Sequence, residues 1–143
     1  MTNVAHVIQN KIEQNIFTIS PESTVLEAIS LMADKGIGAL VVTDQDKVVG
    51  IFSERDYTRK IILMERTSKE TTVSEIMTAK VLTVTKSNSV EDCLNLMTDR
   101  HLRHLPVVEN DKLIGLISIG DLVKVVMEDQ RKLIDQLQQY IAS

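Results

Sequence analysis

Several residue types and patterns are scarce in this sequence, and each scarcity excludes a class of protein. Tryptophan is absent and aromatic residues make up only 3% of 143 residues, so the core must be aliphatic. A single cysteine, Cys93, rules out an internal disulfide. No apolar run approaches the roughly 18 residues of a membrane span. The N-terminus lacks the basic and long apolar stretches of an export signal, so we expect a cytoplasmic protein.

An excess of basic residues is also missing. The net charge is −4, whereas sequence-independent nucleic-acid binding needs clustered Lys and Arg. The few aromatic side chains also leave little for bases to stack on. These two features disfavour nucleic acid as a partner. With 43% apolar and 25% charged residues, the chain has the composition and length of one globular domain.

The sequence does contain an internal repeat. Residues 17–58 align with residues 82–123 without a gap, at a constant offset of 65. The identical pairs include Gly50/Gly115, Ser53/Ser118 and Asp56/Asp121. Repeated supersecondary units complete each other's cores. The repeat therefore predicts one pseudo-symmetric module over residues 1–143, with a cleft between the copies that occurs twice.

Each copy predicts the element order β-α-β-β-α, an α/β (α+β) fold. The first helices are expected to start at Thr24 and Ser89, hydroxyl residues followed at N3 by a carboxylate, as in a capping box. A short apolar strand precedes each helix, at residues 16–19 and 81–84. Two more apolar strands joined by a tight turn follow each helix, and Ser53 and Ser118 then begin the second helices.

Two further segments lie outside the repeat. Residues 3–12 predict a short amphipathic helix, and residues 128–143 form the end of a C-terminal helix. We place the two repeats at residues 12–64 and 76–127. The C-terminal helix carries an apolar stripe that comprises Val126, Leu133, Ile134, Leu137, Tyr140 and Ile141. Such a stripe must be buried on the same domain or on a second copy, and we expect a homodimer.

The repeated residues resemble a known family. Both copies are similar to the CBS domain. In the first copy the similar segments follow Thr24, Ala39 and Gly50. In the second copy, which matches better, they follow Ile76, His101 and Gly115. The resemblance covers nearly the whole chain as a tandem pair, or Bateman module, that stands alone. It implies two pseudo-twofold-related repeats packed sheet to sheet. It also implies a regulatory sensor of adenosine-containing ligands such as AMP, ATP or NAD, with clefts between the repeats, dimers of four repeats and an effector protein.

Asp56 and Asp121 are the candidate ribose ligands. One carboxylate can accept hydrogen bonds from both hydroxyls of a ribose diol, and such charge-assisted bonds are strong. Each aspartate stands three residues after a serine, Ser53 or Ser118. The same spacing also fits a helix capping box, and by itself it favours the cap. The family resemblance favours the ligand site, and the two roles are compatible.

The adenine and phosphate groups need different surroundings. An adenine slot is expected from the segments before each first strand, and phosphates need cations or a helix N-terminus. Arg103 and His104 match positions that contact phosphates in the related gamma subunit of AMP-activated protein kinase. The slot residues are Lys11, Ile12 and Ile16 for one cleft and Met77, Thr78 and Val81 for the other. The weaker phosphate candidates are Arg100, His101 and, in the first cleft, Arg55.

Other functions find less support in the residues. His101 and His104 lack a third metal ligand nearby, so we expect no metal, and Cys93 occupies a buried helix position as a core residue. The sequence offers no nucleophile paired with a base and no pair of catalytic carboxylates, so we expect no enzymatic activity. The main alternative to a ligand sensor is a dimeric interaction scaffold that needs no ligand.

Overall fold

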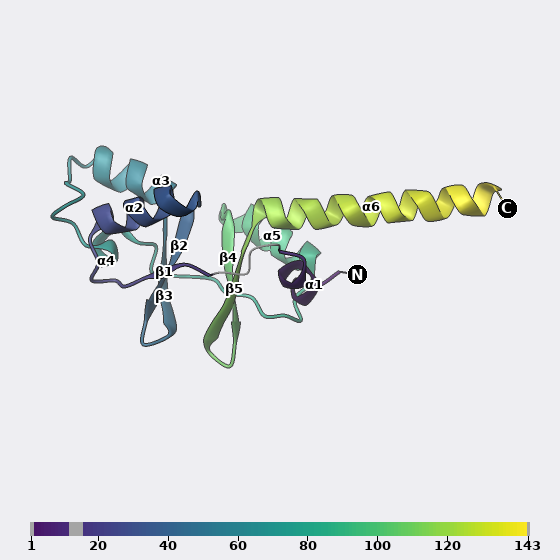
Figure 1. Ribbon diagram of the computed structural model, residues 1–143, viewed down its shortest axis with the longest axis horizontal. Helices are drawn as coiled ribbons and strands as arrows, with labels where there is room; N and C mark the ends of the chain where they lie inside the picture. Colours follow the sequence, from purple (N-terminus) through teal and green to yellow (C-terminus); the bar gives the residue numbers. More distant parts are fainter. Residues whose placement is uncertain (1, 12–15, 143) are drawn as a thin grey trace. The chain divides into compact units, whose positions relative to one another are not determined.

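The computed structural model describes residues 2–11 and 16–142 and divides them into two compact units. The first, here named the Asp56 unit, contains residues 16–83 and 108–114. The second, the Asp121 unit, contains residues 2–11, 84–107 and 115–142. Each unit therefore combines most of one repeat with the segment that precedes the other repeat. The strands and α-helices of each unit are labelled in Figure 1.

The Asp56 unit is built on a three-stranded sheet. Strand β1 (Thr18–Ile19) pairs in parallel with β2 (Ala39–Asp44), which pairs antiparallel with β3 (Lys47–Ser53). Helices α2 (Val25–Lys35) and α4 (Val73–Ile76) supply apolar side chains to the same core as the sheet. Its buried residues are Val25, Ala28, Met32, Leu40, Val42, Phe52, Ile61, Val73 and Ile76.

The helix after β3 is short and changes its winding. It begins as α3 (Glu54–Asp56) and continues as a π-helix, η1 (Tyr57–Ile62). Such wider turns are rare and occur mostly as single-turn insertions. Beyond the helix, Leu63 and Met64 are exposed.

The Asp121 unit contains a two-stranded sheet and three helices. Strands β4 (His104–Glu109) and β5 (Lys112–Ser118) form the sheet, and their connecting tip is grouped with the other unit. Helix α6 (Ile119–Ala142) packs against α1 (Val4–Gln9) and α5 (Val90–Arg100). The buried side chains are aliphatic apart from Cys93: Val4, Val7, Val84, Val90, Cys93, Met97, Leu105, Val107, Ile117, Leu122 and Val125.

The expected helix starts are confirmed in both repeats. The Thr24 hydroxyl accepts a hydrogen bond from the Glu27 amide at 3.1 Å, and the Ser89 hydroxyl accepts one from the Asp92 amide at 3.0 Å. Each hydroxyl thus satisfies an amide that has no partner within its helix. At the opposite end of the first helix, Gly36 adopts the left-handed conformation, which favours glycine at the end of a helix.

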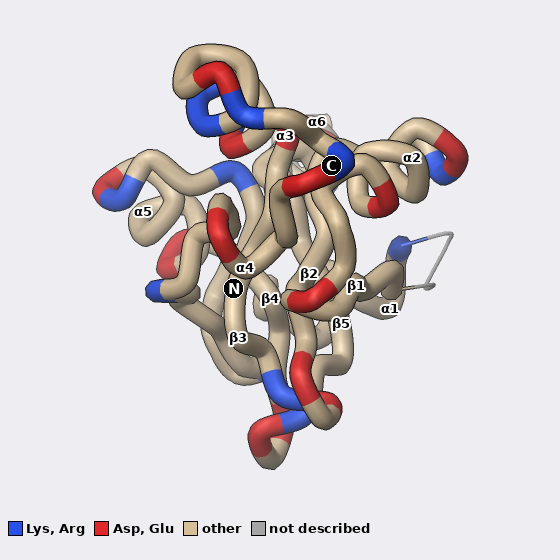
Figure 2. The backbone as a smooth tube through the Cα atoms, turned by 90° about the vertical axis from the view of Figure 1, so that its left-hand side faces the viewer, with Lys and Arg blue, Asp and Glu red and all other residues tan. Residues whose placement is uncertain are grey.

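The tight turns between the paired strands are also confirmed. Gln45 and Asp46 have φ angles of 51° and 65°, and Asn110 and Asp111 have φ angles of 51° and 63°. Two successive residues with positive φ are the mark of the type I′ turn, whose twist matches that of an antiparallel hairpin. Charged residues gather at turns and along helices, while the strands are largely free of charge (Figure 2).

The strand expected at residues 81–84 was a wrong prediction. Only Val84 is paired, through a single parallel bridge to Val107, with its amide donating to the Pro106 carbonyl at 3.0 Å. The first repeat has two such pairs, Thr18–Val41 and Ile19–Val42. Pro106 occupies the position of Val41 and has no N–H to donate, so the ladder loses one position.

The polar segment 65–74 is fixed to the first repeat. The amides of Val25 and Leu26, in the first turn of α2, donate to the carbonyls of Thr71 and Ser68 at 2.9 Å each. These amides have no acceptor within the helix, so the segment completes the N-terminus of α2. The Thr71 side chain is buried as a consequence.

Candidate functional site

Both aspartates of the repeated Ser-x-x-Asp motif cap a helix. The Ser118 amide donates to Asp121 Oδ2 at 2.8 Å, and the Asp121 amide donates to Ser118 Oγ at 3.1 Å. The Ser53 amide donates to Asp56 Oδ2 at 3.0 Å, and the Asp56 amide donates to Ser53 Oγ at 3.3 Å. The capping box that the spacing favours is therefore present twice. Whether each carboxylate can also bind a ligand depends on its other contacts.

The Asp121 cluster consists of Lys11, Ser118 and Asp121. Lys11 Nζ lies 3.0 Å from Asp121 Oδ2 and donates to the Leu116 carbonyl at 2.6 Å. The lysine thus ties the segment after α1 to the start of α6. Side-chain exposure is 32% for Lys11 and 25% for Asp121, so solvent reaches both partners of this ion pair.

The surroundings of Asp121 keep its carboxylate charged. Burial opposes the charged form, but the hydrogen bond from the Ser118 amide and the adjacent Lys11 ammonium outweigh it and lower the pKa of Asp121. Asp121 is therefore an anion at neutral pH. A carboxylate in this state can accept hydrogen bonds but cannot donate one.

The Asp56 cluster is more enclosed. Asp56 Oδ2 accepts from the Ser53 amide and also from the Ser53 hydroxyl, the latter at 3.2 Å. Asp56 Oδ1 accepts from the Thr78 hydroxyl at 3.3 Å and lies 3.6 Å from Lys60 Nζ. Lys60 also donates to the Ile76 carbonyl at 2.8 Å. Both oxygens of Asp56 have partners, and its side chain is only 12% exposed.

Glycines in β3 and β5 let a segment from elsewhere in the chain pack closely on each strand. Residues 77–78 lie against Gly50, and Ile8 of α1 lies against Gly115. A Cβ at Gly50 would lie 2.5 Å from Met77 Sδ and 3.0 Å from the Thr78 carbonyl oxygen. Thr78 can approach this closely because its amide and carbonyl pair with Ile51 at 2.8 and 3.0 Å. A Cβ at Gly115 would lie 3.2 Å from Ile8 Cδ1. The repeated glycine therefore lies where a segment from elsewhere in the chain packs on the strand, and the approach is closer at Gly50 than at Gly115.

The basic corner predicted for the second repeat surrounds the junction between α5 and β4. Arg100 ends α5, and His101 caps it in the left-handed conformation, with φ 56°. His104 is the first residue of β4. The Arg103 carbonyl accepts from the amide of Ile119, two residues before Asp121, at 2.9 Å. The backbone of this corner therefore adjoins the start of α6.

The remaining candidates divide between the units. Met77, Thr78 and Val81 belong to the Asp56 unit, where Thr78 contacts Asp56. Ile16 belongs to the same unit, whereas Lys11 belongs to the Asp121 unit. Ile12 lies outside the described residues. Arg55 is in α3, next to Asp56 in the sequence.

Sequence reasoning missed Lys60, which contacts the carboxylate of Asp56. A detectable signal was present, since an acid followed by a base four residues later on a helix is a favourable pair. Lys60 has no counterpart in the second repeat, where Val125 takes its place. The ammonium beside Asp121 comes instead from Lys11, outside the repeat. The lysines that contact the two carboxylates therefore come from positions that do not correspond in the two repeats.

Other chemical groups add little to these clusters. Burial raises the pKa of Cys93 to about 11, so its thiol stays protonated and unreactive. Among residues 2–11 and 16–142, no group of three or more His, Cys, Asp and Glu side chains could hold a metal ion. Within the same ranges, no helix is long and apolar enough to cross a membrane.

Comparison with known proteins identifies the family. The CBS domain matches the chain twice, at residues 4–63 and 73–128. The chain therefore belongs to the CBS domain family, as the repeated residues indicate. CBS pairs are regulatory modules. Nothing in the comparisons points to enzymatic activity.

Two relatives illustrate the similarity. A protein with CBS domains from Burkholderia ambifaria MC40-6 is 54% identical and has a TM-score of 0.86, covering 90% of this chain and 96% of that one. The CBS domain-containing protein CBSX3, mitochondrial, from Arabidopsis thaliana is 42% identical over 125 residues, which are 84% of this chain. The match spans 61% of the length of the Arabidopsis protein.

Two further solved structures show what similar folds bind or form. A CBS domain pair in complex with 5′-methylthioadenosine and S-adenosyl-L-methionine shares the fold, with a TM-score of 0.75 at 21% identity and coverage of 87% of this chain and 99% of that one. A CBS-CP12 protein from bloom-forming cyanobacteria is hexameric, with a TM-score of 0.75 at 28% identity, over 85% of this chain and 66% of that one. Proteins with CBS pairs therefore include self-associating ones.

Proposed function

We propose that this CBS pair is a sensor that binds an adenosine-containing ligand, AMP, ATP or NAD, at Asp121. Ligand binding changes the conformation of the module, and an effector protein responds to the change. The observation that carries this proposal is the ionised, solvent-accessible carboxylate of Asp121 beside a lysine. The adenosine derivatives bound by a CBS pair of the same fold are consistent with it.

The contacts of the Asp121 carboxylate support its role as a ribose ligand. Within the described part of the chain, the contacts of its carboxylate fall on Oδ2, from the Ser118 amide and Lys11. Oδ1 is then left for one ribose hydroxyl, and Oδ2 can accept the other once Lys11 moves away. The capping bond to Ser118 is retained throughout, so ligand binding does not require the start of α6 to unfold.

Asp56 is the poorer ribose ligand of the two. Its oxygens already accept from Ser53 and Thr78 and face Lys60, and its side chain is nearly buried. A diol would have to displace the Thr78 hydroxyl as well as the lysine. We therefore assign Asp56 a structural role, holding segment 77–78 against β3, and expect one occupied site rather than two.

The phosphate groups of the ligand would be neutralised by Lys11, Arg103 and His104, with Arg100 and His101 farther along the same corner. Lys11 is the link to a conformational change, because it connects the segment after α1 to α6 through Asp121. A ligand whose ribose binds Asp121 and whose phosphate binds Lys11 would replace the ion pair between these two residues. A shift of this kind requires only that the ligand bind the two arrangements with different affinity.

The test compares Asp121→Asn with Asp56→Asn by calorimetry against AMP, ATP and NAD. Asparagine keeps an oxygen that can accept the capping hydrogen bond, so both variants should fold. We expect Asp121→Asn to weaken binding by about 10- to 100-fold, the range for hydrogen bonds to a charged group. Asp56→Asn should change affinity by less than about 3-fold. No heat from any of the three ligands with the unaltered protein would refute the sensor function.

A second candidate, a dimeric interaction scaffold, is favoured by the exposed apolar side chains of α6. In this function the chain self-associates as a homodimer, and Asp121→Asn changes neither assembly nor partner binding. The sensor and the scaffold are both homodimers. We propose that this chain forms a homodimer and that it is located in the cytoplasm. The two functions differ in whether an adenosine ligand alters the dimer.

A further inference from the structure

Helix α6 carries far more apolar surface than its own unit covers. Its first turns pack through Leu122 and Val125, which are buried, but residues 129–142 are all exposed. In Figure 1 the helix extends well past α1 and α5 of the same unit. Residues 129–142 are a short helical segment, and an isolated helix this short is marginal in water because most helical stability comes from packing. The exposed half therefore needs a partner to remain helical.

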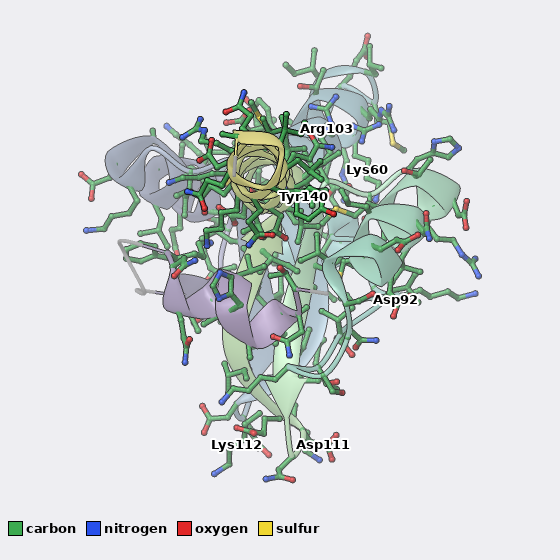
Figure 3. All side chains as sticks on the ribbon, turned by 90° about the vertical axis from the view of Figure 1, so that its right-hand side faces the viewer. Lys60, Asp92, Arg103, Asp111, Lys112 and Tyr140 are labelled. Carbon is green, nitrogen blue, oxygen red and sulfur yellow. The ribbon has the colours of Figure 1, made fainter. Side chains whose placement is uncertain are left out.

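The apolar positions of α6 follow a heptad repeat. Starting from Ile119, the steps alternate between four and three residues, which is the spacing of a helix that packs along one seam. The seam residues are Ile119, Val123, Val126, Gln130, Leu133, Leu137 and Tyr140. Met127, Ile134 and Ile141 each follow a seam residue and widen the stripe on one side. Figure 3 looks along α6 and shows the Tyr140 ring beside the helix.

The seam continues into the half of α6 that packs on its own unit. Ile119 and Val123 are 42% and 45% exposed, although their neighbours Leu122 and Val125 are buried. Leu133 and Leu137 are 56% and 53% exposed. The same face is therefore open from the first turn of the helix to its last. A partner helix can follow it over three heptads, about the minimum for a stable pair.

From these features we infer that α6 pairs in parallel and in register with α6 of a second copy of this chain. The inference rests on the homodimer proposed above and names its interface. A heptad seam is self-complementary, because identical helices present the same knobs and holes to each other. A second copy of the chain is therefore the partner that the sequence of α6 itself specifies.

Gln130 sets the register of the pair. It is the single polar residue of the seam and lies at its middle layer. In a parallel, in-register pair, the two Gln130 side chains meet and their amides can hydrogen-bond to each other. An antiparallel pair centred on the same layer would also bring the two Gln130 residues near each other, so Gln130 constrains the register and the charges beside the seam decide the orientation. One polar residue in such a seam fixes register at some cost in stability.

The charges along the borders of the stripe favour the parallel orientation. At 100° per residue, Asp129 borders the stripe on one side, and Lys124 and Arg131 border it on the other. Parallel packing brings the acidic border of one helix to the basic border of the second. Antiparallel packing places like borders together. Asp129 is held in place by Thr2, whose hydroxyl donates to Asp129 Oδ2 at 2.5 Å.

Analytical ultracentrifugation of the full chain tests the interface. Leu137→Asp places a charge in the seam, and Gln139→Asp places the same charge on the opposite side of the helix. We expect Leu137→Asp to raise the dimer dissociation constant by about 100-fold or more, as for a buried anchor residue. Gln139→Asp should leave that constant within about 3-fold of the value for the unaltered chain.

Disulfide trapping tests the orientation. Tyr140→Cys places a thiol at the end of the seam, where parallel helices bring the two copies together and antiparallel helices separate them. Under mild oxidation we expect a covalent dimer from Tyr140→Cys and almost none from the control Gln139→Cys. Adding Gln130→Leu to Tyr140→Cys should preserve the dimer but lower the yield of disulfide, because register is relaxed. The buried Cys93 thiol does not compete.

The outcomes separate the inference from the proposals on which it rests. A chain that is monomeric at all concentrations would refute the homodimer itself. A dimer that Leu137→Asp leaves intact would refute the α6 interface and keep the homodimer. A dimer that Leu137→Asp dissociates, with no disulfide from Tyr140→Cys, would refute the parallel register. None of these results depends on whether an adenosine ligand binds.

Discussion

The two repeats build the same carboxylate motif and then differ in what surrounds it. In both, a serine at the end of a strand forms a capping box with an aspartate in the first turn of the next helix. In the first repeat the aspartate is enclosed by Thr78 and Lys60. In the second, within the described residues, Lys11 is the one side chain beyond the cap that contacts the carboxylate, and Asp121 is 25% exposed. The repeat therefore supplies the cap, and the surroundings decide which cap can also bind a ligand.

The helices that follow the two carboxylates show the same divergence. In the first repeat the helix widens into a π-helix and ends at Ile62. In the second, α6 continues to Ala142 and exposes an apolar seam. The first repeat thus contributes mainly to packing, and the second carries both the accessible carboxylate and the proposed interface. A pseudo-symmetric fold can divide its functions in this way because each copy needs its neighbours mainly for the core.

The largest expected difference between the repeats concerns the paired glycines. Gly50→Ala should lower the free energy of unfolding by about 2–3 kcal/mol, the upper range for overpacking. The new methyl would meet Met77 and the Thr78 carbonyl, and Thr78 cannot withdraw without losing its two hydrogen bonds to Ile51. Gly115→Ala should cost less than about 1 kcal/mol, since the nearest atoms are Cδ1 and Cγ1 of the flexible Ile8 side chain, at 3.2 and 3.4 Å, and Val107 Cβ lies at ordinary contact distance, 3.8 Å.

Urea unfolding followed by circular dichroism measures both glycine variants against the unaltered chain. Gly38→Ala is a suitable control, because a Cβ there lies at ordinary contact distance, 3.8 Å from the Glu54 side chain. Equal losses for Gly50→Ala and Gly115→Ala would contradict the difference in how closely the two added segments approach.

A smaller effect is expected at the ends of the first helices. Gly36 and His101 occupy the same cap, with φ of 64° and 56°, a conformation that costs a residue with a Cβ about 1 kcal/mol. Placing histidine at position 36 and glycine at position 101 should change the free energy of unfolding in opposite directions. Gly36→His should lower the free energy of unfolding by about 1 kcal/mol, since a Cβ there meets nothing and only the backbone is strained.

His101→Gly should raise stability by up to about 1 kcal/mol for the same reason. Thermal unfolding of the two single variants and of the double exchange measures the effect. A loss of stability from His101→Gly would show that interactions of the histidine side chain outweigh the backbone strain. In that event the cap of the second repeat is held by the side chain and not by conformation.

The smallest effect is a pH dependence at the accessible carboxylate. The pKa of Asp121 is lowered in the folded chain, against the opposing effect of burial, by its bonds to Ser118 and Lys11. The folded state therefore binds the proton less tightly than the unfolded state. The resulting stability is fully present above the ordinary aspartate pKa and is lost as the pH falls through the lower folded value.

Urea unfolding at a series of pH values between 7 and 3 measures this contribution in the unaltered chain and in Asp121→Asn. The difference between them should be constant from pH 7 to about 5 and should shrink below about pH 4. Lys11→Met should reduce the size of this change, because Lys11 is one of the groups that lower the pKa. A difference that grows with acid would contradict the sign of the shift.

Much of the fold could be predicted from local patterns. Thr24 and Ser89 identify helix starts because a hydroxyl at this position satisfies free amides whatever the tertiary structure. The positive φ angles at Gln45, Asp46, Asn110 and Asp111 follow from short hairpins that need a particular turn. The loss of one ladder position at Pro106 could also have been predicted from the sequence, because proline has no N–H to donate. Matching the two repeats by their apolar character concealed that signal.

The environment of the candidate site was less accessible to such reasoning. Ser53 and Asp56, like Ser118 and Asp121, are close in sequence, so their bonds follow from spacing alone. Thr78 and Lys11 reach their carboxylates from distant segments, and Lys60 does so within a helix of unusual winding. Which oxygen each group contacts depends on how those segments pack, and no periodicity in the sequence encodes this.

The amino-acid sequence by itself determined the doubled α/β plan, the caps, the hairpin turns and the heptad seam of α6, because each arises from interactions between residues a few positions apart. Only the tertiary structure decided that Asp56 is enclosed and Asp121 accessible. That difference arises from side chains brought together across long stretches of chain, where small displacements decide whether a carboxylate oxygen has a protein partner or faces solvent.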